Sequence, residues 1–180
     1  MRIVSGKYKG RRINPPKNLP VRPTTDMSKE SLFNILNNHF DFEDLAVLDL
    51  FSGTGNLSYE FASRGSADIT AVDEDAGCIR FIRQTAQEFD FSISAMRINA
   101  YSFLDKDSRQ YDVIVADPPY HFEAEKLLRI PSIVFERKLL SPEGMLIIEH
   151  SKHTSMDAHP YFSFRKNYGG SVFSFFEWPE

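Results

Sequence analysis

The chain has 180 residues, of which 42% are hydrophobic and 26% are charged, the composition of one ordinary globular domain. It contains no apolar run of about 18 residues, its first residues lack the apolar core of a secretory signal, and its single cysteine excludes an internal disulfide. We therefore expect a cytoplasmic protein without a membrane span. We also expect no metal site, because the five histidines form no convincing set of ligands.

The net charge of −4 hides an asymmetry along the chain. Residues 1–25 hold seven basic and no acidic side chains, whereas the remaining residues hold 14 basic and 25 acidic ones, a net charge of −11. An acidic body with a basic segment indicates a polyanionic partner that is held at one end. The alternative is a solvated edge strand whose lysines and arginines prevent aggregation.

The first quarter of the chain predicts a small extension in front of a larger domain. Residues 1–14 alternate around Gly6 and Gly10, which indicates a short β-hairpin, and residues 15–25 form a proline-rich linker. Apolar residues then recur at helical spacing over residues 26–40, with Thr25 or Asp26 as the cap. We expect the basic hairpin extension and linker to span residues 1–24 and one α/β domain to span residues 25–180.

From residue 45 onward, strands alternate with helices. Strands are predicted over residues 45–51, 68–75, 92–99, 111–117 and 144–150, with helices over 56–65, 76–89, 100–106 and 123–140. Such alternation favours a mainly parallel sheet with helices on both faces. A final antiparallel hairpin is predicted over residues 161–178, with Gly169 and Gly170 at its turn.

The first two strands of this domain end in residues suited to binding a nucleoside. The first strand runs into a loop from Asp49 to Asn56, in which Gly53 and Gly55 allow a ligand to approach the backbone closely. The second strand ends at Asp73, whose carboxylate can accept both hydroxyls of a ribose. The alternative is an ordinary glycine turn between solvated acids.

The details of this loop favour S-adenosylmethionine over a dinucleotide. A dinucleotide site needs a third glycine at the position that Ser58 occupies. Asp49 would repel a pyrophosphate but attract the cationic end of S-adenosylmethionine, which also makes a nicotinamide oxidoreductase the weakest reading. Asn99, at the end of the third strand, is expected beside the adenine, where its amide can both donate and accept. The alternative for Asn99 is a helix cap, and both roles are compatible.

The fourth strand ends abruptly in Asp117-Pro118-Pro119-Tyr120, next to the predicted switch point of the sheet. An exocyclic amine of a nucleobase is a poor nucleophile, and acceptors placed at its hydrogens help it to become pyramidal. The Asp117 carboxylate and the Pro118 carbonyl are suitable acceptors, and the two prolines stiffen the loop. The Tyr120 ring offers a stacking surface worth ~1–3 kcal/mol. The alternative is a simple Asp-Pro turn.

Together these segments resemble a known family. "RPTTD…ESLFNIL", "DLFSGTGNLSYEFASRG", "VDED" and "DVIVADPPY", with the opening "MRIVSGKYKGRRI", are similar to the bacterial small-subunit (16S) ribosomal RNA guanine-N2 methyltransferases, the RsmD family. The Asp-Pro-Pro-Tyr box alone is shared with other nitrogen methylases, and the basic first segment narrows the match. Two departures stand out: Asn99 replaces a usual acid, and "DMSKE" replaces a "DRVRE"-like helix start.

The resemblance implies a Rossmann-like class I methyltransferase fold, with a seven-stranded sheet, over residues 25–180, and S-adenosylmethionine as the methyl donor. It implies that the substrate is one guanine of the small-subunit rRNA in a ribosomal particle, with catalysis by Asp117, Pro118, Pro119 and Tyr120. The cofactor-binding residues expected from it are Asp49, Phe51, Ser52, Gly53, Thr54, Gly55, Asp73, Glu74, Asn99, Ala100, Arg22, Thr24 and Thr25. The expected RNA-binding residues are Arg2, Lys7, Lys9, Arg11, Arg12 and Lys17.

Two alternatives to this function stay open at the level of the sequence. A DNA adenine-N6 methyltransferase uses the same box, but it normally needs a sizeable target-recognition segment, which 180 residues do not show. A catalytically silent RNA-binding module predicts no affinity for S-adenosylmethionine. A methylation assay that offers DNA beside ribosomal subunits distinguishes the DNA methyltransferase from an rRNA methyltransferase. Calorimetry with S-adenosylmethionine distinguishes the silent module from an enzyme.

Overall fold

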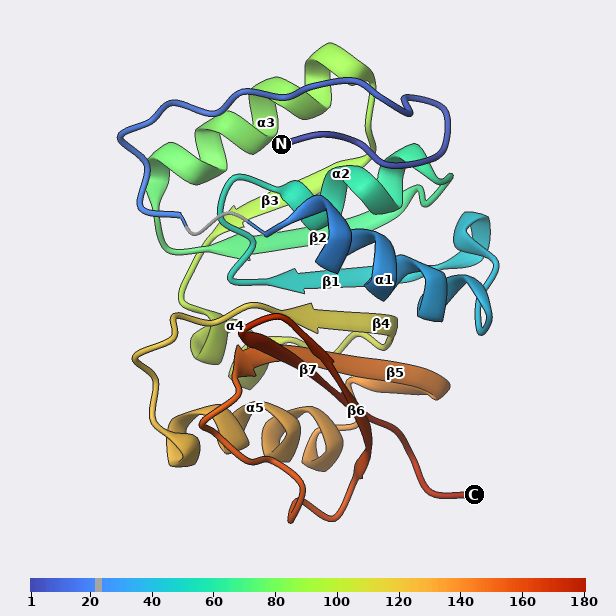
Figure 1. Cartoon of the computed structure of the whole chain (residues 1–180), viewed down its shortest axis with the longest axis vertical. Coiled ribbons are helices and arrows are strands. Elements are labelled where there is room, and N and C mark those ends of the chain that lie inside the picture. The colour runs from blue at the N-terminus through green and yellow to red at the C-terminus, as the bar shows by residue number, and fades with distance from the viewer. Residues whose placement is uncertain (22–23) are drawn as a thin grey trace.

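A computed structural model describes residues 1–21 and 24–180 of the chain as a single sheet with helices on both faces (Figure 1). The strands are β1 (Ala46–Leu50), β2 (Asp68–Asp73), β3 (Ile93–Arg97), β4 (Tyr111–Ala116), β5 (Leu140–Ser151), β6 (Phe162–Tyr168) and β7 (Ser171–Phe176). The helices are α1 (Asp26–Asn37), α2 (Asn56–Ser63), α3 (Ala76–Phe89), α4 (Ala100–Lys106) and α5 (Ala124–Glu136), with a short 3-10 helix at Phe42–Asp44.

The sheet has the order β3-β2-β1-β4-β5-β7-β6. Strands β1 to β5 are parallel, and β7 runs antiparallel between β5 and β6. The prediction of a seven-stranded, mainly parallel sheet that closes with an antiparallel hairpin is therefore confirmed. Helix α5 continues through Pro131, although proline lacks the N–H that a helix interior uses, and α1 and α5 end a few residues before their predicted ends.

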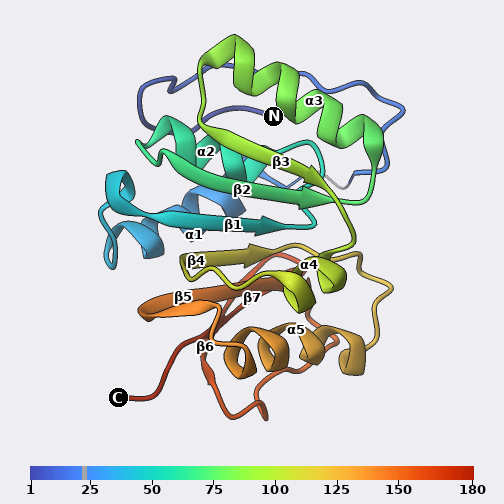
Figure 2. The same cartoon turned by 180° about the vertical axis from the view of Figure 1, so that it is seen from behind.

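Two apolar layers hold the helices to the sheet. Helices α1, α2 and α3 cover one face and α4 and α5 cover the other, as the two opposite views show (Figures 1 and 2). Phe33 and Phe61 pack with Val113 on the first face, whereas Leu104 and Ile130 lie in the core of the second. Alternate residues of each strand point to opposite faces, so the central strands are apolar on both sides and read as continuous hydrophobic runs.

The register of the central strands brings three loops to one edge of the sheet. Strand β1 lies between β2 and β4, and Leu50 at its end is paired with Val72 on one side and with Ala116 on the other. The chain order reverses at this point, which is where open α/β sheets bind their ligands. The segments that follow β1, β2 and β4 therefore meet beyond the carboxyl ends of these strands.

The predicted N-terminal β-hairpin is present in shortened form: Arg2 and Arg12 make an antiparallel bridge, and the N–H groups of Ile3 and Ile13 donate to the carbonyls of Arg11 and Met1. The backbone N–H groups of Val4 and Ser5 donate instead to the Glu60 carboxylate of α2, and that of Lys7 donates to the carbonyl of Ser63. These donors are not available for a ladder across the hairpin. The segment lies on α2 and α3 as a loop, and Gly6 (φ 86°) allows its close approach, because a Cβ there would stand 2.0 Å from the Ser63 oxygen.

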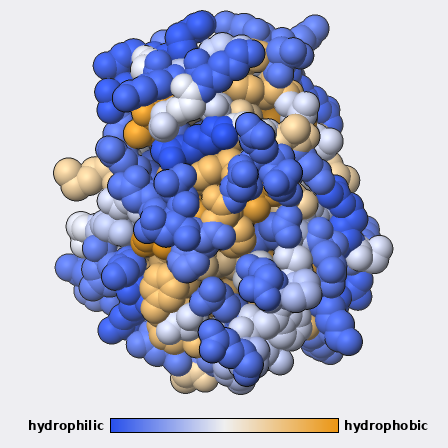
Figure 3. All heavy atoms as spheres, turned by 90° about the vertical axis from the view of Figure 1, so that its right-hand side faces the viewer, coloured by the Kyte–Doolittle hydropathy of each residue, from blue (hydrophilic) through white to orange (hydrophobic). Residues whose placement is uncertain are grey.

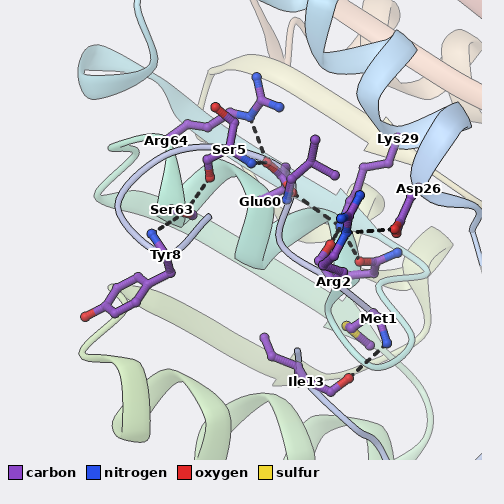
Figure 4. Close-up of polar contacts among 12 residues, drawn as sticks. Met1, Arg2, Ser5, Tyr8, Ile13, Asp26, Lys29, Glu60, Ser63 and Arg64 are labelled. Carbon is purple, nitrogen blue, oxygen red and sulfur yellow. Dashed lines mark hydrogen bonds and ion pairs between the residues drawn. The ribbon is translucent and has the colours of Figure 1, made fainter. Parts of the chain in front are cut away.

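Glu60 is the centre of the cluster that fixes this segment (Figure 4). Its side chain is fully buried and pairs with Arg64 at 2.9 Å and with Lys29 of α1 at 3.3 Å. Lys29, itself 1% exposed, also donates to the Arg2 carbonyl at 2.5 Å and to Asn56 Oδ1 at 2.9 Å. Burial lowers the pKa of the Lys29 ammonium, and the nearby Glu60 carboxylate opposes that shift. One carboxylate thus joins the N-terminal segment, α1 and α2.

The surface at the other edge of the sheet, where the parallel strands begin, is described by its hydropathy. The face at the amino ends of the parallel strands is mostly hydrophilic, with smaller apolar areas between the polar side chains (Figure 3). Among the described residues, no helix is long and apolar enough to cross a bilayer.

We expect Glu60→Gln to lower the free energy of unfolding by about 3 kcal/mol, because it leaves the buried Lys29 ammonium without its counter-charge. Urea denaturation of the purified variant measures this change. The matched control is Glu88→Gln on the exposed side of α3, which we expect to stay within about 0.5 kcal/mol of the wild type. Equal midpoints for the two variants would show that the Glu60 cluster contributes little.

Candidate active site

A cavity of about 830 Å³ opens beyond the carboxyl ends of β1, β2, β3 and β4. This volume lies within the usual range of small-molecule sites. Residues from the loops after these strands form its floor, and the N-terminal segment forms a wall through Met1, Pro15, Pro20 and Val21. The cavity therefore needs both the sheet and the segment that the Glu60 cluster holds.

The loop after β1 has an unusual backbone, and the N–H groups of Ser52 and Gly55 donate to carbonyls within the fold. Phe51 has a φ of 56° and Gly53 a φ of 55°, so the chain turns sharply at the end of the strand. Gly55 (φ 92°) precedes the first residue of α2, and a Cβ there would lie 2.6 Å from the Tyr59 ring. Gly55 is thus needed for close packing at the start of the helix, and it does not line the cavity.

Asp73 at the end of β2 is oriented by two backbone hydrogen bonds. Its Oδ2 accepts from Gly53 N at 2.9 Å, and its Oδ1 accepts from Asp75 N at 2.9 Å. Each carboxylate oxygen has a further lone pair available for a ligand. The first of these bonds also ties the glycine loop after β1 to the end of β2.

Asp49 lies deeper, at the base of the same cavity, and is only 2% exposed. Its Oδ2 accepts from Ser58 Oγ at 2.7 Å. Burial raises the pKa of Asp49 to about 7, the nearby Asp73 carboxylate adds to the rise, and the Ser58 hydrogen bonds oppose it. Close by in the chain, Ser52 Oγ is buried and has no hydrogen-bond partner among residues 1–21 and 24–180. Ser52 lines the cavity, so this oxygen is a polar atom that a ligand can satisfy.

Asn99 and Glu74 lie side by side at the edge of the cavity formed by β2 and β3. The Asn99 Nδ2 donates to Glu74 Oε1 at 2.6 Å, and its Oδ1 accepts from Ser102 N at 3.1 Å at the start of α4. The reading of Asn99 as a helix cap is confirmed. A contact of Asn99 with an adenine stays a prediction, for which its second Oδ1 lone pair is available.

The loop after β4 forms the far wall of the cavity. Asp117, Pro118, Pro119 and Tyr120 all line it, with Pro118 buried and Asp117 partly buried. Tyr120 is 43% exposed, and its hydroxyl lies 2.5 Å from Ser171 Oγ at the start of β7. The hydroxyl is thus anchored at Ser171, and Tyr120 lines the cavity.

The structure brings most of the predicted site residues together around this one cavity. Those that line it are Asp49, Phe51, Ser52, Gly53, Thr54, Asp73, Glu74, Asn99, Ala100, Thr24, Asp117, Pro118, Pro119 and Tyr120. Gly55 does not line it, nor does Thr25, whose Oγ1 accepts from Ser28 N and caps α1. Arg22 lies outside the described residues.

The predicted RNA-binding cations are dispersed instead. Arg2 pairs with Asp26 at 3.0 Å, and none of the described members of this set lines the cavity. Lys7 lies beside Ser63, the last residue of α2, and the Arg11 guanidinium lies over the ring of Phe89, the last residue of α3. These helix ends lie away from the cavity, and α3, with 14 residues, is about 20 Å long.

Several lining residues were not predicted from the sequence. Phe122 packs edge-on against Phe51 at 5.8 Å, and the Lys126 ammonium lies 3.8 Å from the centre of the Phe122 ring. Val21 lies 3.1 Å from the position of a Cβ on Gly53. Phe122 directly follows the recognised Asp117–Tyr120 box, which is a usable signal, whereas nothing in a proline-rich linker marks Val21. His121, which follows Tyr120, is exposed and also lines the cavity.

The titratable side chains of the site do not form a metal centre. Over residues 1–21 and 24–180, no group of three or more histidine, cysteine, aspartate or glutamate side chains is arranged to hold a metal ion.

Comparisons with known proteins agree with this geometry. The chain is 31% identical over 157 residues to the ribosomal RNA small subunit methyltransferase D of Buchnera aphidicola from Acyrthosiphon pisum, covering 86% of this chain and 80% of the relative. It is 29% identical over 161 residues to the Escherichia coli K12 protein of the same name, covering 89% and 79%. A solved hypothetical protein of Thermus thermophilus shares the fold, with a TM-score of 0.85 at 22% identity over 98% and 99% of the two chains.

The profile of one protein family matches residues 1–177, which is nearly the entire chain. The match includes the N-terminal segment, the glycine loop, and the Asp117–Tyr120 box, so it spans every wall of the cavity. The chain therefore belongs to the family described as conserved hypothetical protein 95, whose relatives include the ribosomal RNA small subunit methyltransferases D.

Proposed function

We propose that this protein transfers a methyl group from S-adenosylmethionine to the exocyclic N2 amine of a guanine in small-subunit rRNA. The observation that carries the proposal is that Asp73 and the glycine loop, on one side, share a single cavity with Asp117 and Tyr120, on the other. A donor and a flipped base thus have adjacent places at the switch point of the sheet.

The residues on the cofactor side fit the chemistry of S-adenosylmethionine. The free lone pairs of Asp73 suit the two ribose hydroxyls, and the buried Ser52 Oγ offers a hydrogen bond that no described residue satisfies. Asp49, once ionised, suits the cationic end of the cofactor. No pyrophosphate site is built at this loop, because the carboxylate of Asp49 lies at its base and Ser58 replaces the third glycine.

The chain's contribution to the reaction is positioning and charge stabilisation. When bound, the cofactor supplies an electrophilic methyl group on its sulfonium. The Asp117 carboxylate and the Pro118 carbonyl accept the hydrogens of the attacking amine, which favours its pyramidal form as positive charge develops. Tyr120, anchored through Ser171, holds the base by stacking, so the amine and the methyl meet in line.

The identity of the substrate is supported by the family rather than by the cavity alone. The relatives described above are named for methylation of small-subunit ribosomal RNA, and the chain covers about four fifths of their length. A cytoplasmic location follows from such a substrate. The cations of the N-terminal segment stay a prediction as RNA contacts; Arg2 directly follows the wall residue Met1, and Lys17 lies between the wall residues Pro15 and Pro20 in the chain.

Mass mapping of the nucleosides of small-subunit rRNA tests the proposal most directly. We expect one N2-methylguanosine to disappear in cells that lack the protein and to return when the gene is restored. In vitro, ribosomal subunits from the deleted strain are offered beside adenine-containing DNA. Methylation of the DNA alone would favour an adenine-N6 enzyme, and absence of cofactor binding at millimolar concentration would favour a silent RNA-binding module.

We expect Asp117→Ala to reduce turnover by about 10²- to 10³-fold, as removal of one stabilising group of a transition state usually does. The affinity for S-adenosylmethionine should stay within twofold, because Asp73 and the glycine loop hold the cofactor independently of this side chain. Single-turnover methyl transfer and calorimetry measure the two quantities. Turnover near the wild-type rate would remove Asp117 from the mechanism.

We expect the affinity for S-adenosylmethionine to fall about tenfold between pH 8 and pH 6. In the free protein Asp49 has a pKa raised to about 7, so it is mainly protonated at pH 6, whereas the cationic ligand favours its ionised form. Calorimetry at a series of pH values measures this dependence. Asp49→Asn should bind more weakly at pH 8 and lose the pH dependence, and a flat wild-type profile would contradict the assignment.

A further inference from the structure

A second, shallower depression of about 380 Å³ lies between α3 and the end of β3. Its polar lining consists of Arg80, Arg83, Arg97, Gln84 and Gln87, and no carboxylate lines it. We call these five residues the arginine groove. Since residues 26–180 carry a net charge of −11, three arginines without a lining acid are a marked local exception.

Two of the three arginines are held in place by uncharged partners. Arg83 Nη2 donates to the carbonyl of Ala95 at 2.8 Å, and Arg97 Nε donates to the carbonyl of Glu74 at 3.1 Å. Arg80 forms no hydrogen bond or ion pair with any described residue. The Asp75 side chain caps α3 by accepting from Cys78 N, which lowers the pKa of its carboxyl, and the nearby Arg97 adds to this shift. The groove thus keeps oriented donors and an excess of positive charge among the residues that line it.

The groove runs along α3 from Ala76 to Gln87, and its Arg97 end adjoins the cavity. Glu74 lines the cavity, and its backbone carbonyl accepts a hydrogen bond from Arg97 of the groove, so the two depressions are neighbours. Arg97 ends β3 and Asp117 follows β4, three strand spacings apart, which is about 14 Å. In contrast, Lys7 and Arg11 lie by the last residues of α2 and α3, at the far end.

We infer that the arginine groove binds phosphate groups of the rRNA strand that flanks the methylated nucleotide. Guanidinium groups present planar forks of donors that match phosphate oxygens, and the two glutamine amides can bind phosphate or the 2′-hydroxyl. This inference rests on the proposed function. It assigns RNA contacts to Arg80, Arg83 and Arg97 of the methyltransferase body, in addition to the basic N-terminal segment.

The test is the salt dependence of methyl transfer to ribosomal subunits by Arg80→Gln/Arg83→Gln. Each phosphate contact that is lost lowers the slope of log affinity against log salt by about 0.7 to 1. We therefore expect this variant to lose at least tenfold in kcat/KM at low salt and to have a slope reduced by about 1.5 to 2. The affinity for S-adenosylmethionine should be unchanged.

The matched control is Lys106→Gln/Arg137→Gln, which removes the same charge from exposed positions at the ends of α4 and α5. Arg137 Nη2 donates to the carbonyl of Asp107 at 2.8 Å, as Arg83 does to that of Ala95. We expect the slope of this control to equal that of the wild type. Arg80→Glu alone supplies a variant that breaks no bond of the fold and should still weaken transfer.

The outcomes separate the groove from the function. If the wild type methylates rRNA but the groove variants keep its kcat/KM and its salt dependence, the groove does not bind RNA, and the proposed function stands. If the wild type does not methylate rRNA, the proposed function fails, and fluorescence anisotropy with a short RNA decides the groove by the same slopes. If inorganic phosphate slows chemical modification of the Arg80 guanidinium but RNA does not, the groove is a small-anion site and the inference is overturned.

Discussion

Parallel pairing of β1 with β2 on one side and with β4 on the other is the constraint on which the site depends. Because Leu50 is paired with both Val72 and Ala116, the three strands end at one level, and Asp73 and Asp117 emerge at the same edge. The bond from Gly53 N to Asp73 Oδ2 then fixes the glycine loop against the end of β2. The pairing of the strands, rather than any one catalytic side chain, thus provides adjacent places for a methyl donor and its substrate.

The second requirement is a wall, and the N-terminal segment provides it. Glu60 captures the backbone N–H groups of Val4 and Ser5 and balances the charge of Lys29. Lys29 in turn reaches the carbonyl of Arg2 and the side chain of Asn56, a residue that lines the cavity. A buried ion pair contributes little net stability when its desolvation is counted. Its value here is specific: it determines where the first residues of the chain lie relative to the cofactor loop.

The alternation of strands and helices was predictable from the sequence because apolar periodicity directly reflects the sheet and its two covers. Asp73 and Asp117 could be predicted as site residues since each ends an apolar run, and parallel strands share a carboxyl edge. The N-terminal β-hairpin was predicted, but its shortening was not predictable, because the Val4 N–H donates to a glutamate 56 residues away. Gly55 and Thr25 were predicted to bind the cofactor because they lie within recognised motifs. Gly55 instead packs closely against Tyr59, and Thr25 caps α1. The wall residue Val21 depends on tertiary contacts alone.

The hydrogen bond between Arg83 and the Ala95 carbonyl has a consequence for the solubility of the protein. Strand β3 is an edge of the sheet, with Met96 42% exposed, and open edges invite pairing with a second chain. A charged side chain that occupies a backbone acceptor of this edge removes one position at which a foreign strand could begin to add. The same arginine therefore occupies one acceptor of the open β3 edge while it orders the groove beside it.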